Sequence, residues 1–199
     1  MEDVETVKAE ALQIMGVFQV LPRLVVFDLD YTLWPFYCEC RSKRDTPYLY
    51  PHARGILRAL KREEIDVVIA SKSPTPDIAT TYLDKLSISS MFVAKVPVLN
   101  LRMEYFHTPQ AFPPLRWTNK TDHFQRIHSR TGVPFNSMLF FDDDNNNIQG
   151  VIKRASIVSK MGVTSILVRN GVNLGEFKEG LAKFSQKWNA SQNMQKRRN

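Results

Sequence analysis

The chain has 199 residues, of which 43% are hydrophobic, and its formal net charge is +7. This length and apolar content suit one domain with a packed core and argue against a disordered chain. Residues 187–199 hold four basic residues and no acid, so a basic, disordered tail explains much of the charge, and we do not expect a nucleic-acid partner.

The N-terminal part predicts a short helix and no membrane segment. Apolar residues recur at three- and four-residue intervals from residue 3 to 18, so residues 1–20 are predicted to form a helical appendage. The acidic start lacks the basic flank of a signal peptide, and only two cysteines, Cys38 and Cys40, occur. We expect a cytoplasmic protein with access to the nucleus and without membrane association. The sequence does not indicate an oligomeric state.

The strongest feature is an apolar run that ends in two acids. Residues 24–27 read Leu-Val-Val-Phe, which is typical of a strand buried on both faces of a parallel sheet. Asp28 and Asp30 follow at the carboxyl end of this strand, where open α/β sheets bind their ligands. Residues 31–50 have no helical period and predict a flap too small to be a large cap domain.

Helices and strands alternate through the rest of the chain. The sequence predicts further strands at 65–70, 91–94, 138–141 and 163–168. It predicts helices at 51–64, 73–86, 119–130, 148–160 and 174–184. This alternation indicates an α/β fold with a doubly wound, Rossmann-like parallel sheet.

Polar residues follow several of these strands. Ser71 ends the second strand, Lys120 begins a helix, and Asp142 and Asp143 follow the strand before them. Because parallel strands end at one edge of the sheet, we expect these groups to converge on Asp28. Gathered carboxylates repel one another, and their oxygen atoms favour Mg²⁺ over zinc as the neutralising ion. Together the groups suggest phosphoryl transfer.

These residues resemble the motifs of a known family. Residues 28–36 begin with D-x-D-x-T, the first motif of the haloacid dehalogenase-like phosphohydrolases. The later motifs of that superfamily match, in order, Ser71, Lys120 and the pair Asp142 and Asp143. The Trp-Pro-Phe extension of the first motif is similar to the magnesium-dependent phosphatase 1 branch. The resemblance covers about residues 22 to 186.

The resemblance implies a reaction and a role for each residue. Asp28 would be the nucleophile that forms an aspartyl-phosphate, and Asp30 would be the general acid and base. The implied ligands of Mg²⁺ are Asp28, the backbone carbonyl of Asp30, Asp142 and Asp143. The implied phosphate-binding residues are Ser71, Lys72 and Lys120. The implied substrates are phosphotyrosine on proteins or phosphosugars of the fructosamine type.

Departures from that branch leave an alternative open. Lys72 stands where the branch has an arginine, and a single-point cation loses bidentate phosphate geometry. Residues 95–117 and 151–158 look inserted within the predicted phosphatase domain, 21–186. The alternative is therefore a catalytically impaired phosphate-binding or regulatory variant of the same fold. A phosphatase for nucleic-acid ends is disfavoured, because no aromatic and basic residues interleave near the site.

Some aromatic side chains allow two interpretations. Trp34, Phe36 and Tyr37 fit packing within the flap, and they also fit the mouth of a substrate site. We expect His123 and His128 at the surface or half-buried, and not as metal ligands.

Overall fold

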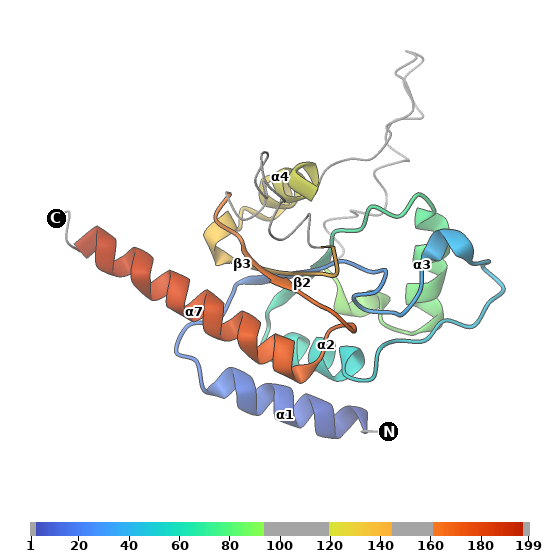
Figure 1. The fold of residues 1–199 in the computed structure, drawn as a ribbon, viewed down its shortest axis with the longest axis horizontal. Helices are drawn as coiled ribbons and strands as arrows, with labels where there is room; N and C mark the ends of the chain where they lie inside the picture. Colours follow the sequence, from blue (N-terminus) through green and yellow to red (C-terminus); the bar gives the residue numbers. More distant parts are fainter. Residues whose placement is uncertain (1–2, 94–119, 145–160, 197–199) are drawn as a thin grey trace, which may run out of the picture.

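The computed structural model describes residues 3–93, 120–144 and 161–196. Within them, four parallel strands form one sheet in the order β2-β1-β3-β4. The strands are β1 (Leu24–Phe27), β2 (Asp66–Ile69), β3 (Met138–Asp142) and β4 (Thr164–Leu167). Helices lie on both faces of this sheet (Figure 1), which confirms the predicted doubly wound α/β fold.

The register of the central strands decides which residues emerge at the carboxyl edge. Phe27 pairs with Ile69 of β2 and with Phe141 of β3. The ladder continues for one more residue, because the Asp28 amide donates to the Phe141 carbonyl (3.0 Å). Asp28 and Asp142 therefore leave neighbouring strands at the same edge, as the sequence predicts.

One face of the sheet is covered by α1 (Val4–Gly16), α2 (Ala53–Arg62) and α7 (Leu174–Lys196). Val7 of α1 is fully buried, and a Cβ atom on Gly55 of α2 would lie 2.5 Å from its Cγ1. Such close contact shows that α1 packs tightly against α2. The domain boundary near residue 20 stays a prediction.

The other face is covered by α4 (Lys120–Thr131). Phe124 and Ile127 are fully buried there, and the Phe124 ring meets Phe140 of β3 edge-on at 5.0 Å between centroids. His123 is only 1% exposed, so the prediction that it lies at or near the surface is wrong. Its position one turn before Ile127 places it on the inward stripe of the helix. His128 is half-buried, as predicted.

Two predicted elements differ from the structure. In place of a strand at 91–94, a 3₁₀ turn, η2 (Ser89–Met91), is followed by extended chain whose Val93 amide donates to the Val67 carbonyl (2.9 Å). The predicted disordered tail from residue 187 is helical as far as Lys196. No glycine or proline interrupts residues 185–196, and Trp188 stacks on Phe184, so the helix continues.

The remaining segments are short. The flap between residues 31 and 50 contains a 3₁₀ turn, η1 (Cys38–Cys40), and the helix α3 (Pro76–Lys85) packs beside it, so the cap is minimal, as predicted. A third 3₁₀ turn, η5 (Phe135–Ser137), precedes β3. The predicted insertions and the helix predicted at 148–160 fall outside the described residues. None of the described helices has the length and apolar content needed to cross a membrane.

Candidate active site

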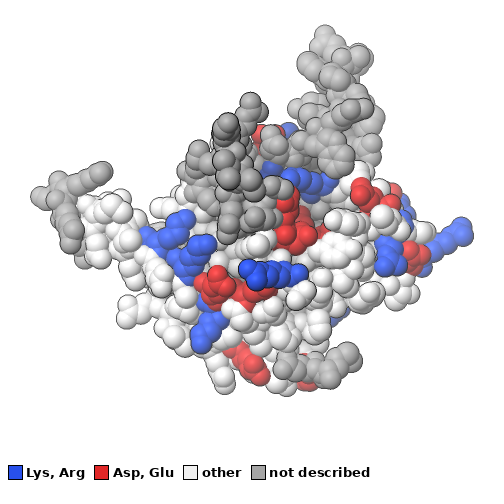
Figure 2. Space-filling model, viewed as in Figure 1, with Lys and Arg blue, Asp and Glu red and all other residues white. Residues whose placement is uncertain are grey.

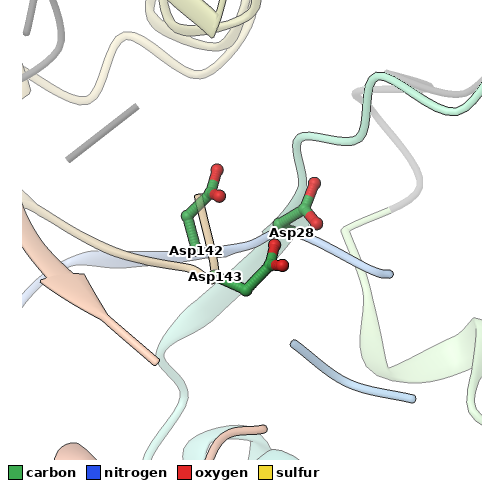
Figure 3. Close-up of side chains that lie close together, drawn as sticks. All are labelled: Asp28, Asp142 and Asp143. Carbon is green, nitrogen blue, oxygen red and sulfur yellow. The ribbon is translucent and has the colours of Figure 1, made fainter. Parts of the chain in front are cut away.

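Three carboxylates meet at the carboxyl edge of the sheet. Asp28 follows β1, Asp142 ends β3, and Asp143 comes next (Figure 3). Each offers an oxygen atom, and these atoms lie within 4.8 Å of one another. The predicted convergence of these acids is therefore present in the folded chain.

Lys120 joins this group from the opposite layer. It is the first residue of α4 and only 4% exposed, and its Nζ lies 2.5 Å from Asp28 Oδ1 and 3.1 Å from Asp142 Oδ2. The same ammonium donates to the carbonyl of Ala70, directly after β2. A lysine is unfavourable at a helix N-terminus, and these partners offset that cost. Lys120 thus connects the ends of three strands.

Asp30 is held apart from the three carboxylates. Its Oδ1 accepts hydrogen bonds from the Trp34 indole (2.7 Å) and from the Cys38 amide (3.3 Å). Trp34 is fully buried and stacks on Phe36, which fixes this donor. Burial raises the pKa of Asp30, and the two hydrogen bonds partly offset the rise. Asp30 is therefore a rigidly oriented carboxyl group on the flap side of Asp28.

Ser71 and Lys72 follow β2 beside the Lys120 contact. Both are half-buried, and Ser71 Oγ accepts a hydrogen bond from the Ser73 amide (3.2 Å). Burial lowers the pKa of His123 to about 3, and the charges of Lys120 and Lys72 add to this effect. His123 is thus a neutral side chain, and both lysines act on the same part of α4.

The electrostatics of the three carboxylates indicate a shortage of positive charge. Burial raises the pKa of Asp28 to about 7, with Asp142 adding to the rise and Lys120 opposing it. Burial and then the charge of Asp142 raise the pKa of Asp143 to about 6. The pKa of Lys120 is itself raised, because its two carboxylate partners outweigh the effect of burial. A site of clustered oxygen ligands that lacks cationic charge fits Mg²⁺.

The two acids after β3 differ in their surroundings. Asp142 is 1% exposed, its Oδ2 pairs with Lys120, and its Oδ1 accepts a hydrogen bond from the Asp144 amide (2.8 Å). Asp143 is half-buried and lines an open pocket. Asp143 is therefore placed to bind an ion that enters from solvent, whereas Asp142 is occupied within the protein.

We predict that Mg²⁺ stabilises the protein more at pH 8 than at pH 5. The folded-state pKa values of Asp28 and Asp143, about 7 and about 6, lie above the ordinary value of 3.8. The stability that the two acids contribute is fully present below about pH 3.8, where both are protonated in the folded and unfolded chain, and it is lost as the pH rises through about 6 to 7. A bound cation compensates for the ionised acids, so the Mg²⁺-dependent increase in Tm should grow over this range. Thermal unfolding with EDTA or Mg²⁺ at both pH values measures it.

Two variants provide the comparison for this experiment. Asp143→Asn should show a smaller Mg²⁺-dependent increase in Tm, because it removes one ligand. Asp66→Asn should behave as wild type, since Asp66 is exposed at the opposite edge of the sheet, where β2 begins. An equal Mg²⁺ effect at pH 5 and pH 8 in wild type would contradict the assignment of the ion to these acids.

An open pocket of about 460 Å³ adjoins the carboxylates. Its lining residues are Tyr31, Tyr37, Asp143, Leu167, Val168 and Arg169. Of the three ambiguous aromatic residues, Trp34 and Phe36 are buried in packing, whereas Tyr37 is 49% exposed at this pocket. Acidic side chains lie in the middle of this face of the molecule with basic ones close by (Figure 2). Arg169 lies in no recognised sequence motif, so the sequence alone predicts no role for it.

Comparisons with known proteins agree with this geometry. A family model described as Acid Phosphatase matches residues 20–48 and 42–187. The magnesium-dependent phosphatase 1 of Homo sapiens is 31% identical over an alignment 182 residues long, which covers 83% of this chain and 88% of that protein. A HAD-like hydrolase superfamily protein of Schizosaccharomyces pombe is 30% identical over an alignment 178 residues long, which covers 78% of this chain and 92% of that protein.

One solved structure is also similar to the chain. It is the N-terminal part of a Bacteroides fragilis protein that contains a phosphatase domain, and it is complexed with Mg. The match has a TM-score of 0.49 and 17% sequence identity, and it covers 88% of this chain and 43% of that chain.

Proposed function

We propose that this chain, which belongs to the acid phosphatase family, hydrolyses phosphate monoesters through an aspartyl-phosphate on Asp28. The chain is a haloacid dehalogenase-like phosphatase with magnesium as its cofactor, as its motifs predict. One observation carries the proposed mechanism: buried Asp28 contacts Lys120 within a group of carboxylates at the sheet edge. This is an anionic nucleophile beside a cation that can bind a phosphoryl oxygen.

The proposed reaction has two steps. An oxygen of Asp28 attacks phosphorus, the bond to the leaving oxygen breaks, and Asp30 gives that oxygen its proton. Asp30 then removes a proton from a water molecule, which attacks phosphorus and releases inorganic phosphate and the free Asp28 carboxylate. The hydrogen bonds from Trp34 and Cys38 orient Asp30 for both transfers.

The phosphoryl group would be bound by residues from β2 and α4. Lys120 would share its ammonium between Asp28 and a phosphoryl oxygen. The Ser71 oxygen already accepts a hydrogen bond from Ser73, so the hydroxyl hydrogen can point to a second phosphoryl oxygen. Lys72 would add a point charge on the same side.

The metal ligands follow from the environment of each acid. Asp28 and Asp143 would hold Mg²⁺ with the backbone carbonyl of Asp30, while Asp142 would support the site by holding Lys120. When bound, Mg²⁺ supplies positive charge that reduces the repulsion between the phosphate and Asp28. The all-carboxylate side-chain set supports this assignment.

The substrate classes are phosphotyrosine on a protein or a small phosphosugar of the fructosamine type. The minimal cap leaves the site open, so it could accept either a protein side chain or a free metabolite. The cytoplasm is the location we propose for this activity.

Trapping the intermediate tests the mechanism. After brief incubation with Mg²⁺ and para-nitrophenyl phosphate and an acid quench, we expect one phosphoryl group on the peptide that contains Asp28, detected by mass spectrometry. Hydroxylamine should remove it, because it cleaves acyl phosphates. Asp66→Asn is the matched control and should form the same adduct. Turnover without an adduct would contradict the mechanism, and the absence of both would favour the impaired variant.

A further inference from the structure

We propose that the pocket lined by Tyr31, Tyr37 and Arg169 binds the leaving group of the substrate and selects a ring that carries a second anionic group. This inference rests on the proposed function and specifies its substrate class. Three features of the pocket support it: an exposed aromatic wall, the position of that wall beside Asp30, and an arginine among the lining residues.

The aromatic wall consists of two phenol rings that the fold leaves exposed. Tyr31 and Tyr37 meet edge-on at 4.7 Å between centroids and are 37% and 49% exposed. Tyr31 has a left-handed backbone with φ +54, which costs about 1–2 kcal/mol for a residue with a side chain. Two other described residues that are not glycine, Glu64 and Ser87, also have a positive φ. Each follows the end of a helix, where this conformation is common. Tyr31 instead lies in a hydrogen-bonded turn, in which the Thr32 amide donates to the Leu29 carbonyl (3.1 Å), so this turn fixes the backbone that carries the Tyr31 ring.

The wall also lies where the leaving group must depart. Tyr31 directly follows Asp30, and Tyr37 precedes Cys38, whose amide binds the Asp30 carboxylate. Because Asp30 protonates the leaving oxygen in the proposed reaction, the rest of the leaving group extends toward these rings. A flat ring can stack on an exposed tyrosine, as aromatic pairs do elsewhere in proteins.

Arg169 supplies positive charge to the pocket. It is exposed and is the one cation among the described residues that line it. Its guanidinium forms no salt bridge with an acid in the part of the chain that the structure describes. A planar guanidinium binds a carboxylate through two parallel hydrogen bonds, which a solvated surface lysine does not.

The backbone around Arg169 is fixed to the catalytic edge and to the flap. The Val168 amide donates to the Asp142 carbonyl and the Val172 amide to the Thr32 carbonyl, each at 2.9 Å. Between them, Gly171 has φ +72, and a Cβ atom there would lie 2.1 Å from the Tyr50 ring. The turn that bears Arg169 is therefore preorganised, which lowers the entropic cost of binding.

The dimensions suit a small cyclic leaving group. A volume of about 460 Å³ falls within the range of about 300–1,000 Å³ found for small-molecule sites. The lining combines two tyrosine rings, the apolar residues Leu167 and Val168, and the charged side chains of Asp143 and Arg169. A carboxylate on the ring would face Arg169 while the phosphate lies at Asp28.

Two matched esters test the selection for an anion. We would measure kcat/KM for 4-carboxyphenyl phosphate and for its neutral analogue 4-carbamoylphenyl phosphate with wild type, Arg169→Gln and Arg62→Gln. The preference of wild type for the carboxylate ester should fall about tenfold in Arg169→Gln, as expected for the loss of a charged hydrogen bond. Arg62→Gln should keep the wild-type preference, since Arg62 is exposed at the end of α2, before the amino end of β2.

A second variant tests the aromatic wall. Tyr37→Leu should lower kcat/KM for both aryl esters relative to glycerol phosphate, and comparison with wild type cancels the different reactivities of these esters. If Arg169→Gln keeps the carboxylate preference of wild type, the pocket assignment is wrong while the phosphatase function stands. If wild type hydrolyses none of these esters, the proposed function fails and this inference fails with it.

Discussion

Asp28→Asn should reduce the hydrolysis of para-nitrophenyl phosphate by at least about 10³-fold at saturating Mg²⁺, because an amide in place of the proposed nucleophile cannot form the acyl phosphate. The amide has nearly the same shape, so the surroundings of Lys120 and Asp142 should persist. The reduction should appear in kcat, and no phosphoryl adduct should form. Steady-state release of phosphate measures the effect.

Stability separates this chemical effect from misfolding. Burial raises the pKa of Asp28, so its ionised form opposes folding at pH 8 without a metal, and the neutral amide removes that cost. Metal-free Asp28→Asn should therefore unfold at a temperature no lower than wild type, and its stabilisation by Mg²⁺ should be smaller. Asp66→Asn removes an exposed acid and should retain full activity. Equal activity of Asp28→Asn and wild type would exclude Asp28 as the nucleophile.

The sheet could be predicted because its signal is local. The runs at 24–27 and 138–141 are almost wholly apolar, and such runs form strands only when both faces are covered. The segment at 91–94 has a similar composition, yet of its described residues, 91–93, only Val93 bonds to β2. Whether an edge segment forms a ladder depends on its partner and not on its own residues, so composition alone could not decide it.

The end of α7 was predicted wrongly for a different reason. The basic composition of residues 187–199 indicated a disordered tail, but the helix continues to Lys196. The Lys187 ammonium donates to the Val163 carbonyl (3.2 Å), and Trp188 packs on Phe184. Charge counted along the chain does not show that one side of this segment faces the domain.

The candidate site was predictable to the extent that motifs mark it. Asp28, Asp142 and Lys120 come together because each stands at a strand or helix end, and topology alone brings those ends to one edge. The roles of Trp34 and Arg169 could not be predicted from the sequence and emerge only from the folded structure. Trp34 holds Asp30 through an indole N–H in a turn, and Arg169 meets the flap across the sheet edge, so neither has a sequence spacing that indicates its contact.

The close contact of Lys120 with Asp28 also bears on the impaired alternative. Lys120 reaches Asp28 and Asp142 although 50 residues separate it from its acceptor at Ala70. The described part of the chain therefore brings the proposed nucleophile together with Lys120 and the acidic pair: Lys120 contacts Asp28 and Asp142, and oxygen atoms of Asp28, Asp142 and Asp143 lie within 4.8 Å of one another. This arrangement supports an active enzyme over a phosphate-binding variant, and the trapping experiment distinguishes the two.

Lys120→Met should lower kcat/KM by about 10²–10³-fold, because a preorganised cation is lost from the phosphoryl site. It should also destabilise the metal-free protein at pH 8 by about 3–5 kcal/mol, since two buried carboxylates lose their partner. Methionine fills a similar volume, so the cost reflects charge rather than a cavity. Urea unfolding and phosphate release measure the two effects.

Metal and pH should then restore stability without restoring activity. Mg²⁺ can compensate for Asp28 and Asp142, and protonation at pH 5 does the same for Asp28, whose pKa is raised to about 7. The difference in unfolding free energy between Lys120→Met and wild type should therefore shrink under either condition. Lys183→Met is the control. Lys183 is exposed on α7, and its ammonium donates to the Ser165 carbonyl, so the substitution should change the free energy of unfolding by no more than about 0.5 kcal/mol. A Lys120→Met protein with wild-type activity would show that Lys120 serves the fold alone. Mg²⁺ could balance the charge of the carboxylates in this variant, but a bound phosphoryl oxygen would still lack the Lys120 donor.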